Sequence, residues 1–382
     1  MKIAYLGKIQ LSDVDLSYLH EAQKISDITY ILEISPRFRQ GPAFCLDTVA
    51  NRNGVFKATD IYPEFAKYSD FIDMDKFYVV NTSGKLWQLK AFWTNFLLLL
   101  FLIRKGFNLI HVVWPLNIYE FVLYILKRKM ILTVHDPFPH TGNDTFIVRL
   151  RRKVAFALVP RFIVLNKAQV QQFIDFYRLP KSKVIVSKLS NYTYLRTVKP
   201  QLSQVPQKQR YILFAGKISK YKGLDYLLPA MEKVHKQYAD VKLVVAGGGR
   251  YHFDISKYLA KEYIDIRNHF IPDAELVALL SNAMFVVCPY TDATQSGVVM
   301  SAFAFNKPVL VTDVGGLPEM TGDGRYGRIA RRKDVDALAT AITELIANPA
   351  ELQRYSQNIA SDYDTGNLSW KAIAKDLNDK YK

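Results

Sequence analysis

The sequence predicts an α/β protein with two Rossmann-like, doubly wound domains in series. Short β-branched runs alternate with helical stretches, as in parallel-sheet domains. These runs form two sets, separated by residues 191–210, which are rich in polar residues and prolines and lack apolar periodicity. A length of 382 residues also favours two domains over one. Because ligands of this fold class bind at the carboxyl ends of the strands, we expect the two sheets to face a central cleft.

The elements follow in chain order. The first set of expected strands covers residues 2–6, 30–33, 109–113, 130–134 and 162–165, and the second covers residues 211–214, 241–245, 285–288 and 308–312. These sets give a first domain over residues 1–195 and a second over residues 208–364. A terminal helix within residues 365–382 places Leu368, Ile373, Leu377 and Tyr381 near one another, and we expect it to pack back on the first domain.

Composition excludes several classes of protein. Hydrophobic residues make up 49% and charged residues 23%, as in an ordinary globular chain. Two cysteines cannot build a disulfide framework in a chain of this length. The opening residues lack the pattern of a secretion signal, and the most apolar run, residues 96–103, is far shorter than the roughly 20 residues of a spanning helix. We therefore expect a cytoplasmic location.

The positive charge is concentrated in one window. Of the formal net charge of +16, residues 101–222 contribute 22 basic and 4 acidic side chains. Such a field attracts phosphate groups, nucleic acid or an anionic lipid surface. Nucleic acid is not an expected partner, since the chain has no nucleic-acid-binding motif. Residues 145–158 form a basic amphipathic pattern, and residues 86–102 are rich in aromatic residues. These segments form either a peripheral membrane surface, at the inner face of the cell membrane, or plain core helices.

Loops that follow the second set of strands carry a candidate site for a phosphate-containing ligand. After residues 211–214 come Gly216, Lys217 and Lys222, where glycine lets the backbone approach a ligand and the lysines suit a diphosphate, although a lysine-rich loop is usually surface. The second loop contains Asp292, Thr294 and Gln295 and leads to Ser296, Gly297 and Val298 at an expected helix start, where free amides bind anions and Ser also acts as an N-cap. Two further glycine-rich segments follow expected strands. The first contains Gly248 and either faces a nucleobase or simply forms a loop, and the second is Gly315-Gly316, followed by Glu319.

One residue of the first domain is a catalytic candidate. His135 follows the expected strand 130–134. A lone histidine is more often structural, but one at the carboxyl end of a parallel strand gains weight as a functional residue. Lys8, in the loop after the first strand, either reaches a phosphate or is solvated.

The order of these motifs resembles a known family. The series FAGKISKYKGLDYLL, VVAGGG, FIPDAELVALLSNAMFVVCPY and TQSGVVMSAFAFNKPVLVTDVGGLPE is similar to the donor domain of the retaining glycosyltransferases of family 4, which have GT-B architecture. The resemblance implies a nucleotide-sugar donor in the second domain, an acceptor in the first, and no required metal. It also implies that Lys217 and Lys222 hold the donor diphosphate and that His135 lies near the donor sugar.

The sequence departs from the family at two positions. Alignment on Lys307-Pro308-Val309 puts Ala293 and Ser301 where the family carries two glutamates, which hold the donor sugar and the ribose. We expect Ser301 to reach a ribose hydroxyl and Asp292, Thr294 or Gln295 to replace the first glutamate.

The combined interpretation is a retaining hexosyltransferase that moves a sugar from a nucleotide diphosphate sugar to a saccharide acceptor, lipid-linked in polysaccharide biosynthesis. No cofactor is expected. Four scattered Asp-x-Asp pairs are interpreted as chance, and phosphate-loop, zinc-hydrolase and serine-hydrolase motifs are absent from the sequence. The alternatives are a sugar-nucleotide epimerase of the same shape, a catalytically silent nucleotide-sugar binder, and a bilobal solute-binding protein, which should carry an export signal.

Overall fold

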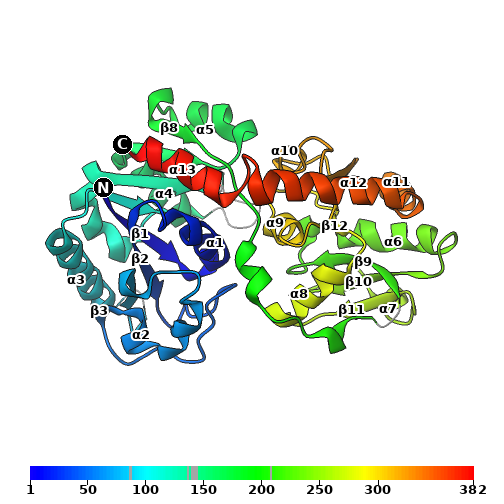
Figure 1. Ribbon diagram of the computed structural model, residues 1–382, viewed down its shortest axis with the longest axis horizontal. Helices are drawn as coiled ribbons and strands as arrows, with labels where there is room; N and C mark the ends of the chain where they lie inside the picture. The colour runs from blue at the N-terminus through cyan, green and yellow to red at the C-terminus, as the bar shows by residue number, and fades with distance from the viewer. Residues whose placement is uncertain (86–87, 136, 139–144, 207–208) are drawn as a thin grey trace. The chain divides into compact units, whose positions relative to one another are not determined.

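The chain forms two compact units. A computed structural model describes residues 1–382 except 86–87, 136, 139–144 and 207–208. The first unit comprises Met1–Lys188 together with Trp370–Lys382, and the second comprises Leu189–Ser369. Each unit contains a sheet covered by helices on both faces (Figure 1).

The sheet of the first unit is parallel except at one edge. Its strands stand in the order β3-β4-β2-β1-β5-β6-β7-β8, and β3 runs antiparallel to β4. The bounds are β1 (Lys2–Lys8), β2 (Asp27–Ile34), β3 (Gly54–Lys57), β4 (Phe77–Asn81), β5 (Leu109–Val112), β6 (Met130–Val134), β7 (Arg161–Val164) and β8 (Val184–Val186).

Alternating side chains of β1 face two different helical layers. Ala4 and Leu6 join a core with the helices α3 (Leu89–Lys105), η4 (Ile118–Lys129, a 3-10 helix) and α4 (Phe146–Leu158). Tyr5, between them, faces α1 (Ser12–Ala22) and α13 (Trp370–Tyr381), where its ring lies 5.6 Å from that of Tyr18. The shorter helices are α2 (Ala58–Ile61) and α5 (Val170–Tyr177). The period of two in a strand thus assigns each helix group to its own face.

The sheet of the second unit is parallel throughout. Its order is β11-β10-β9-β12-β13-β14, with bounds β9 (Arg210–Ala215), β10 (Val241–Ala246), β11 (Ile264–Arg267), β12 (Val286–Cys288), β13 (Val309–Thr312) and β14 (Gly327–Ala330). The helices are α6 (Leu224–His235), α7 (Ser256–Leu259), α8 (Asp273–Asn282), α9 (Gly297–Phe303), α10 (Leu317–Met320), α11 (Val335–Ala347) and α12 (Pro349–Ala360). Leu227, Leu243 and Ile342 belong to one core that joins α6 and α11 to the sheet.

The structure confirms every strand expected from the sequence and adds others. The added strands β3, β8, β11 and β14 lie at sheet edges, and β4 lies next to β3. Edge strands are short and partly exposed, so they lack the continuous apolar run of a buried parallel strand. For example, Ile264–Arg267 has the sequence IDIR and only its first residue is buried.

The polar, proline-containing sequence of residues 191–210 predicts a linker between the domains, but the structure shows this segment packed. They belong to the second unit, where Tyr192, Tyr194 and Leu195 are buried. The Tyr192 amide donates to the Met300 carbonyl at 3.2 Å, and the Gln201 amide donates to the Ala274 carbonyl at 2.8 Å. The segment packs through single aromatic side chains and backbone hydrogen bonds, neither of which produces a periodic sequence pattern.

Candidate functional site

The candidate site lies where the strand order of the second sheet reverses. Strand β9 has β10 on one side and β12 on the other. In open parallel sheets, ligands bind at such a switch point, beyond the carboxyl ends of the strands. Gly216 and Lys217 follow β9, and the segment that leads to Ser296 follows β12. The lysines and the Ser296 segment therefore flank the switch point.

Gly216 brings the exit of β9 close to the start of α9. Its φ is +100°, a conformation that favours glycine, and a Cβ there would lie 3.2 Å from Cγ2 of Val298. Lys217 follows with an exposed side chain. The structure thus places Gly216, at the exit of β9, beside Val298 in the first turn of α9.

The turn that carries Lys222 is fixed against the loop after β12. Gly223 has φ +69°, and a Cβ there would lie 1.9 Å from the Pro289 carbonyl oxygen. The Thr291 amide donates to the Tyr221 carbonyl at 2.7 Å. Two backbone contacts therefore hold the 3-10 turn η9 (Lys220–Lys222) beside the strand exit.

Lys222 is a cation held in a protein environment without a matching anion. Its Nζ donates to the Tyr290 hydroxyl at 2.6 Å and lies 3.8 Å from the centroid of the same ring. Burial lowers its pKa to about 8, although the nearby Cys288 thiol acts in the opposite direction. Among the described residues, no carboxylate forms an ion pair with Lys222. The environment can therefore receive a negative charge from a ligand.

Tyr290 connects Lys222 to the start of α9. Its buried hydroxyl lies 3.2 Å from Oγ of Ser296, and Ser296 Oγ accepts a hydrogen bond from the Val299 amide at 3.4 Å. Burial raises the pKa values of both Tyr290 and the neighbouring Cys288 thiol. Ser296 is thus an N-cap as expected. The sequence interpretation missed Tyr290, although it stands in the same strand-exit run.

The remaining residues of α9 show how tightly this start is packed. A Cβ on the exposed Gly297 would lie 3.0 Å from the Tyr192 hydroxyl oxygen. Ser301 donates its hydroxyl hydrogen to the Gly297 carbonyl at 3.0 Å. Because that proton is used within the helix, Ser301 can meet a ribose hydroxyl only as an acceptor.

The loop between β12 and α9 also contacts the turn before α10. A Cβ on Gly315, whose φ is +51°, would lie 1.5 Å from the Ala293 carbonyl oxygen. The Ser296 amide donates to the Met320 sulfur at 3.3 Å. The site candidates differ in exposure: Asp292 and Glu319 are exposed, Gln295 is half-buried, and Thr294 is buried.

The glycine-rich exit of β10 completes this group of loops. A Cβ on Gly247 would lie 2.1 Å from the Gly216 carbonyl oxygen, and the Ile218 amide donates to the Gly248 carbonyl at 3.0 Å. The loops after β9, β10 and β12, together with the turn before α10, therefore meet at the carboxyl edge of one sheet. The donor-site residues predicted from the sequence belong to these loops or to the helices α9 and α10 that follow them.

His135 belongs to the first unit, where it directly follows β6 and is half-buried. Its neighbour His111, on β5, is fully buried. Burial, together with a smaller contribution from the charge of His135, lowers the pKa of His111 to about 3. His135 is thus the member of this pair that is partly open to solvent.

Lys8 neither reaches a phosphate nor is solvated, contrary to both expectations. It is buried and forms ion pairs with Glu33 and, at 2.7 Å, with Glu120. Glu33 also accepts a hydrogen bond from the Tyr119 hydroxyl at 3.0 Å. Glu120 lies 112 positions from Lys8 along the chain, so no local pattern could reveal this cluster.

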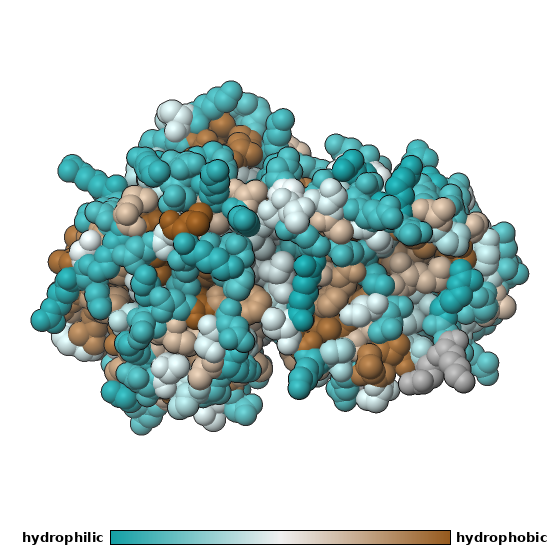
Figure 2. Space-filling view, viewed as in Figure 1, coloured by the Kyte–Doolittle hydropathy of each residue, from teal (hydrophilic) through white to brown (hydrophobic). Residues whose placement is uncertain are grey.

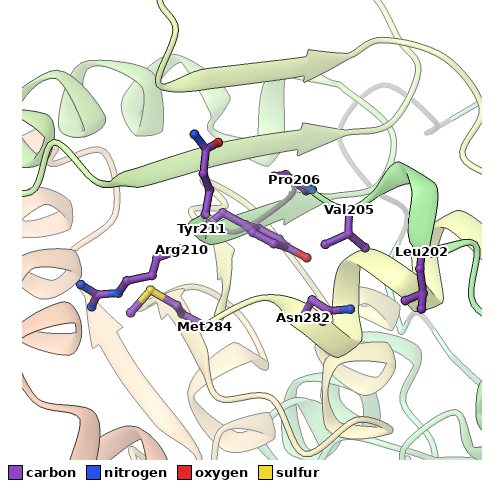
Figure 3. Close-up of a pocket in the computed structure, with 8 residues that line it drawn as sticks. Leu202, Val205, Pro206, Arg210, Tyr211, Asn282 and Met284 are labelled. Atoms are coloured by element: carbon purple, nitrogen blue, oxygen red, sulfur yellow. The ribbon is translucent and has the colours of Figure 1, made fainter.

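A cavity of about 520 Å³ in the second unit lies away from these loops. It is lined by Arg210 and Tyr211 at the amino end of β9, whereas Gly216 and Lys217 follow its carboxyl end. In Figure 3, Tyr211 points toward Val205 while Arg210 extends the other way beside Met284. None of the predicted site residues lines this cavity.

Comparisons with known proteins agree with this geometry. Residues 196–362 match the family model described as glycosyl transferases group 1. An uncharacterized glycosyltransferase of Haemophilus influenzae is 26% identical over 257 residues, which cover 65% of this chain and 70% of that protein. For two further curated glycosyltransferases the matched region covers only 46% and 62% of their length.

Solved structures share the architecture over the whole chain. Sucrose-phosphate synthase from Thermosynechococcus elongatus has a TM-score of 0.70 at 17% identity and covers 100% of this chain, with 98% of its own chain matched. Anabaena Alr3699/HepE, solved in complex with UDP and glucose, has a TM-score of 0.68 at 13% identity, with 100% and 99% coverage. The chain therefore has the GT-B fold, with two Rossmann-like α/β domains, and is a relative of the group 1 glycosyltransferases.

Proposed function

We propose that the protein is a retaining glycosyltransferase of family 4 that transfers a sugar from a nucleotide diphosphate sugar to a hydroxyl of a saccharide. The observation that carries the proposal is Lys222. It is a cation at the switch point of the second sheet, has a lowered pKa, and has no carboxylate partner in the described part of the chain. A diphosphate supplies the anion that this environment lacks.

The proposed chemistry breaks the bond between the anomeric carbon and the donor phosphate and forms a glycosidic bond to the acceptor oxygen. Lys217, Lys222 and the amides near Ser296 stabilise the negative charge that develops on the departing diphosphate, in place of a metal ion. The acceptor proton passes to the leaving phosphate. His135 positions or polarises the reacting groups.

A ligand of a protein with the same fold supports the proposed donor, and the charge of the first unit supports the proposed acceptor. UDP and glucose are the ligands of the Anabaena protein of the same fold, which supports a uridine diphosphate sugar as the first donor to test. We propose a lipid-linked saccharide in polysaccharide assembly as the acceptor, because the first unit contains most of the basic window 101–222.

The first experiment measures thermal unfolding with UDP, GDP, ADP and their sugar conjugates. A ligand at about 100 times its dissociation constant stabilises the native state by about 2.7 kcal/mol. We expect one nucleotide series to stabilise the protein, and Lys222→Met to remove that effect. Lys220→Met is the matched control, because Lys220 lies in the same turn with an exposed side chain. No stabilisation by any nucleotide would contradict the proposal.

The turnover rate and the products then distinguish a glycosyltransferase from an epimerase and from a silent binder. We expect Lys222→Ala to lower turnover by about 100-fold or more, the scale of losing one group that stabilises a transition-state oxyanion. Conversion of the nucleotide sugar without an acceptor would indicate an epimerase. Binding without any reaction would indicate a silent binder.

A further inference from the structure

Three neighbouring helices of the first unit carry apolar side chains on both their inner and outer faces. Leu98 and Leu102 of α3, Leu123 of η4 and Phe156 of α4 all belong to one core against the first sheet. Helix η4 packs against both α3 and α4. The outer faces of the three helices therefore lie on the same side of this unit.

The outer face of α3 is an apolar stripe. Its exposed members recur every three or four residues, and at 100° per residue they fall within an arc of about 100°. Trp93, 59% exposed, stacks on Phe96 with ring centroids 5.5 Å apart. The buried Leu98 and Leu102 lie on the opposite side of the helix. The stripe consists of Leu89, Phe92, Trp93, Phe96, Leu100 and Ile103.

Helices η4 and α4 extend this exposed apolar surface. Ile125 is 69% exposed and Ile147 is 74% exposed. At the outer edge of the first unit, over α3, Figure 2 shows hydrophobic side chains among hydrophilic ones. Monomeric soluble proteins rarely expose such a group of large apolar side chains without a binding role. The members on these two helices are Ile118, Phe121, Ile125, Phe146, Ile147 and Leu150.

Basic side chains accompany the apolar ones. The three helices contain ten lysines and arginines and a single acidic residue, Glu120, which is buried and paired with Lys8. Lys90, Arg104, Lys127 and Arg128 are exposed, and within the described residues none of these four pairs with a carboxylate. The surface formed by α3, η4 and α4 is therefore apolar and cationic at once; we call it the basic apolar face.

We propose that the basic apolar face binds an anionic lipid bilayer. The apolar side chains insert at the level of the headgroups, where Trp is favoured, and the lysines and arginines contact lipid phosphates. In this arrangement the three helices lie along the bilayer surface, as amphipathic helices do. No helix in the described residues is long and apolar enough to cross the bilayer. Two copies of this face would repel each other because both are positively charged. This repulsion disfavours dimerisation through the basic apolar face.

The binding experiment uses the full chain without nucleotide or acceptor, so its result is independent of the proposed transfer reaction. Vesicles of phosphatidylcholine alone are compared with vesicles of equal parts phosphatidylcholine and phosphatidylglycerol in a flotation assay. We expect the protein to float with the anionic vesicles and to remain unbound with the neutral ones. Equal flotation with both, or with neither, would overturn the proposal.

An apolar pair of substitutions tests the stripe. We expect Trp93→Ser/Phe96→Ser to weaken binding to the anionic vesicles by about tenfold or more, because burial of large apolar surface drives interfacial insertion. The matched control is Leu259→Ser/Phe270→Ser, which removes two apolar side chains of the second unit that are at least as exposed as Trp93 and Phe96. Unchanged thermal unfolding of both variants establishes that each is folded. Equal losses in both pairs would contradict a specific face.

A charge pair tests the cationic part. A basic residue near an anionic surface contributes about fivefold in affinity, so Lys127→Glu/Arg128→Glu should weaken binding by about 30-fold or more. Lys236→Glu/Lys261→Glu makes the same charge change at exposed positions of the second unit and should retain at least half of the wild-type flotation in excess vesicles. If sedimentation instead shows self-association that Trp93→Ser/Phe96→Ser abolishes, and no vesicle binding occurs, the face is a dimer surface and the proposal is wrong.

Discussion

Lys222 illustrates how a single residue obtains its properties from its surroundings. A lysine in a lysine-rich loop is ordinary surface, but this one lies beside the buried Tyr290 ring and Cys288, where burial disfavours its charge. A bound diphosphate would restore the charge, because an adjacent anion favours the protonated amine. Affinity for the donor should therefore depend on the proton of this residue.

At the residue scale we predict that nucleotide affinity falls as pH rises through about 8, the lowered pKa of Lys222. Below this pH the amine is protonated and attracts the diphosphate, and above it the proton is lost. If only the charged form binds, the dissociation constant for UDP rises by up to about tenfold per pH unit above the pKa. Calorimetric titration between neutral and alkaline pH measures this dependence.

Two variants identify the group responsible for that pH dependence. Lys222→Arg should bind with little pH dependence over the same range, because a guanidinium keeps its proton. Lys220→Arg, in the same turn, should keep the wild-type profile. An unchanged profile in Lys222→Arg would assign the titration to another group.

At the scale of elements, the sequence predicted the interior strands and the loops after them better than the contacts between loops. Buried parallel strands contain continuous apolar runs, such as residues 211–215 of β9, and motifs at their ends have recognisable spacing. The contact of Gly223 with the Pro289 carbonyl joins positions far apart in the chain, so spacing could not reveal it. The same holds for Tyr290, whose role depends on where the Lys222 turn lies.

We predict that Gly223→Ala displaces the η9 turn and lowers stability. The new methyl carbon would lie 1.9 Å from the Pro289 carbonyl oxygen, far inside van der Waals contact, and φ of +69° adds strain. We expect a loss of about 2 to 4 kcal/mol in the free energy of unfolding, together with weaker UDP binding. Denaturant unfolding and nucleotide titration measure the two effects.

Gly106→Ala is the matched control for this substitution. Gly106 ends α3 with φ +66°, and a Cβ there meets nothing within 4 Å. Its replacement should cost only the strain of the left-handed backbone, about 1 kcal/mol, and leave UDP binding unchanged. Equal losses in both variants would mean that the Pro289 contact contributes nothing.

At the scale of the whole molecule, the chain leaves the first unit, builds the second, and returns. Helix α13 completes the first unit through buried polar contacts that no sequence pattern specified. The Tyr381 hydroxyl lies 3.0 Å from that of Tyr18 and 2.8 Å from Nδ1 of His111, whose other ring nitrogen lies 2.6 Å from the Thr133 hydroxyl. The apolar periodicity of the sequence predicted the helix, but only the structure shows these polar partners, through which the first unit depends on it.

We therefore predict that the two units differ in their ability to fold alone. Residues 189–369 are continuous, have their own core, and carry all the predicted donor loops, so this fragment should unfold cooperatively and bind UDP within about tenfold of the full chain. Residues 1–188 lack α13, so the buried polar atoms of Tyr18 and His111 lose their Tyr381 partner. Each lost partner lowers the free energy of unfolding by about 1 to 3 kcal/mol, and the absence of the helix also exposes apolar surface.

Circular dichroism and denaturant titration of three fragments check this prediction. Residues 1–188 alone should unfold with low cooperativity, whereas the same fragment joined to residues 370–382 by a flexible linker should regain a sharp transition. Tyr381→Phe in the joined fragment should lower its stability, because the hydroxyl that bridges Tyr18 and His111 is lost while the helix and its apolar contacts remain. If residues 1–188 unfold as cooperatively as the joined fragment, α13 is an accessory helix, and the dependence of the first unit on its distant terminal segment is refuted.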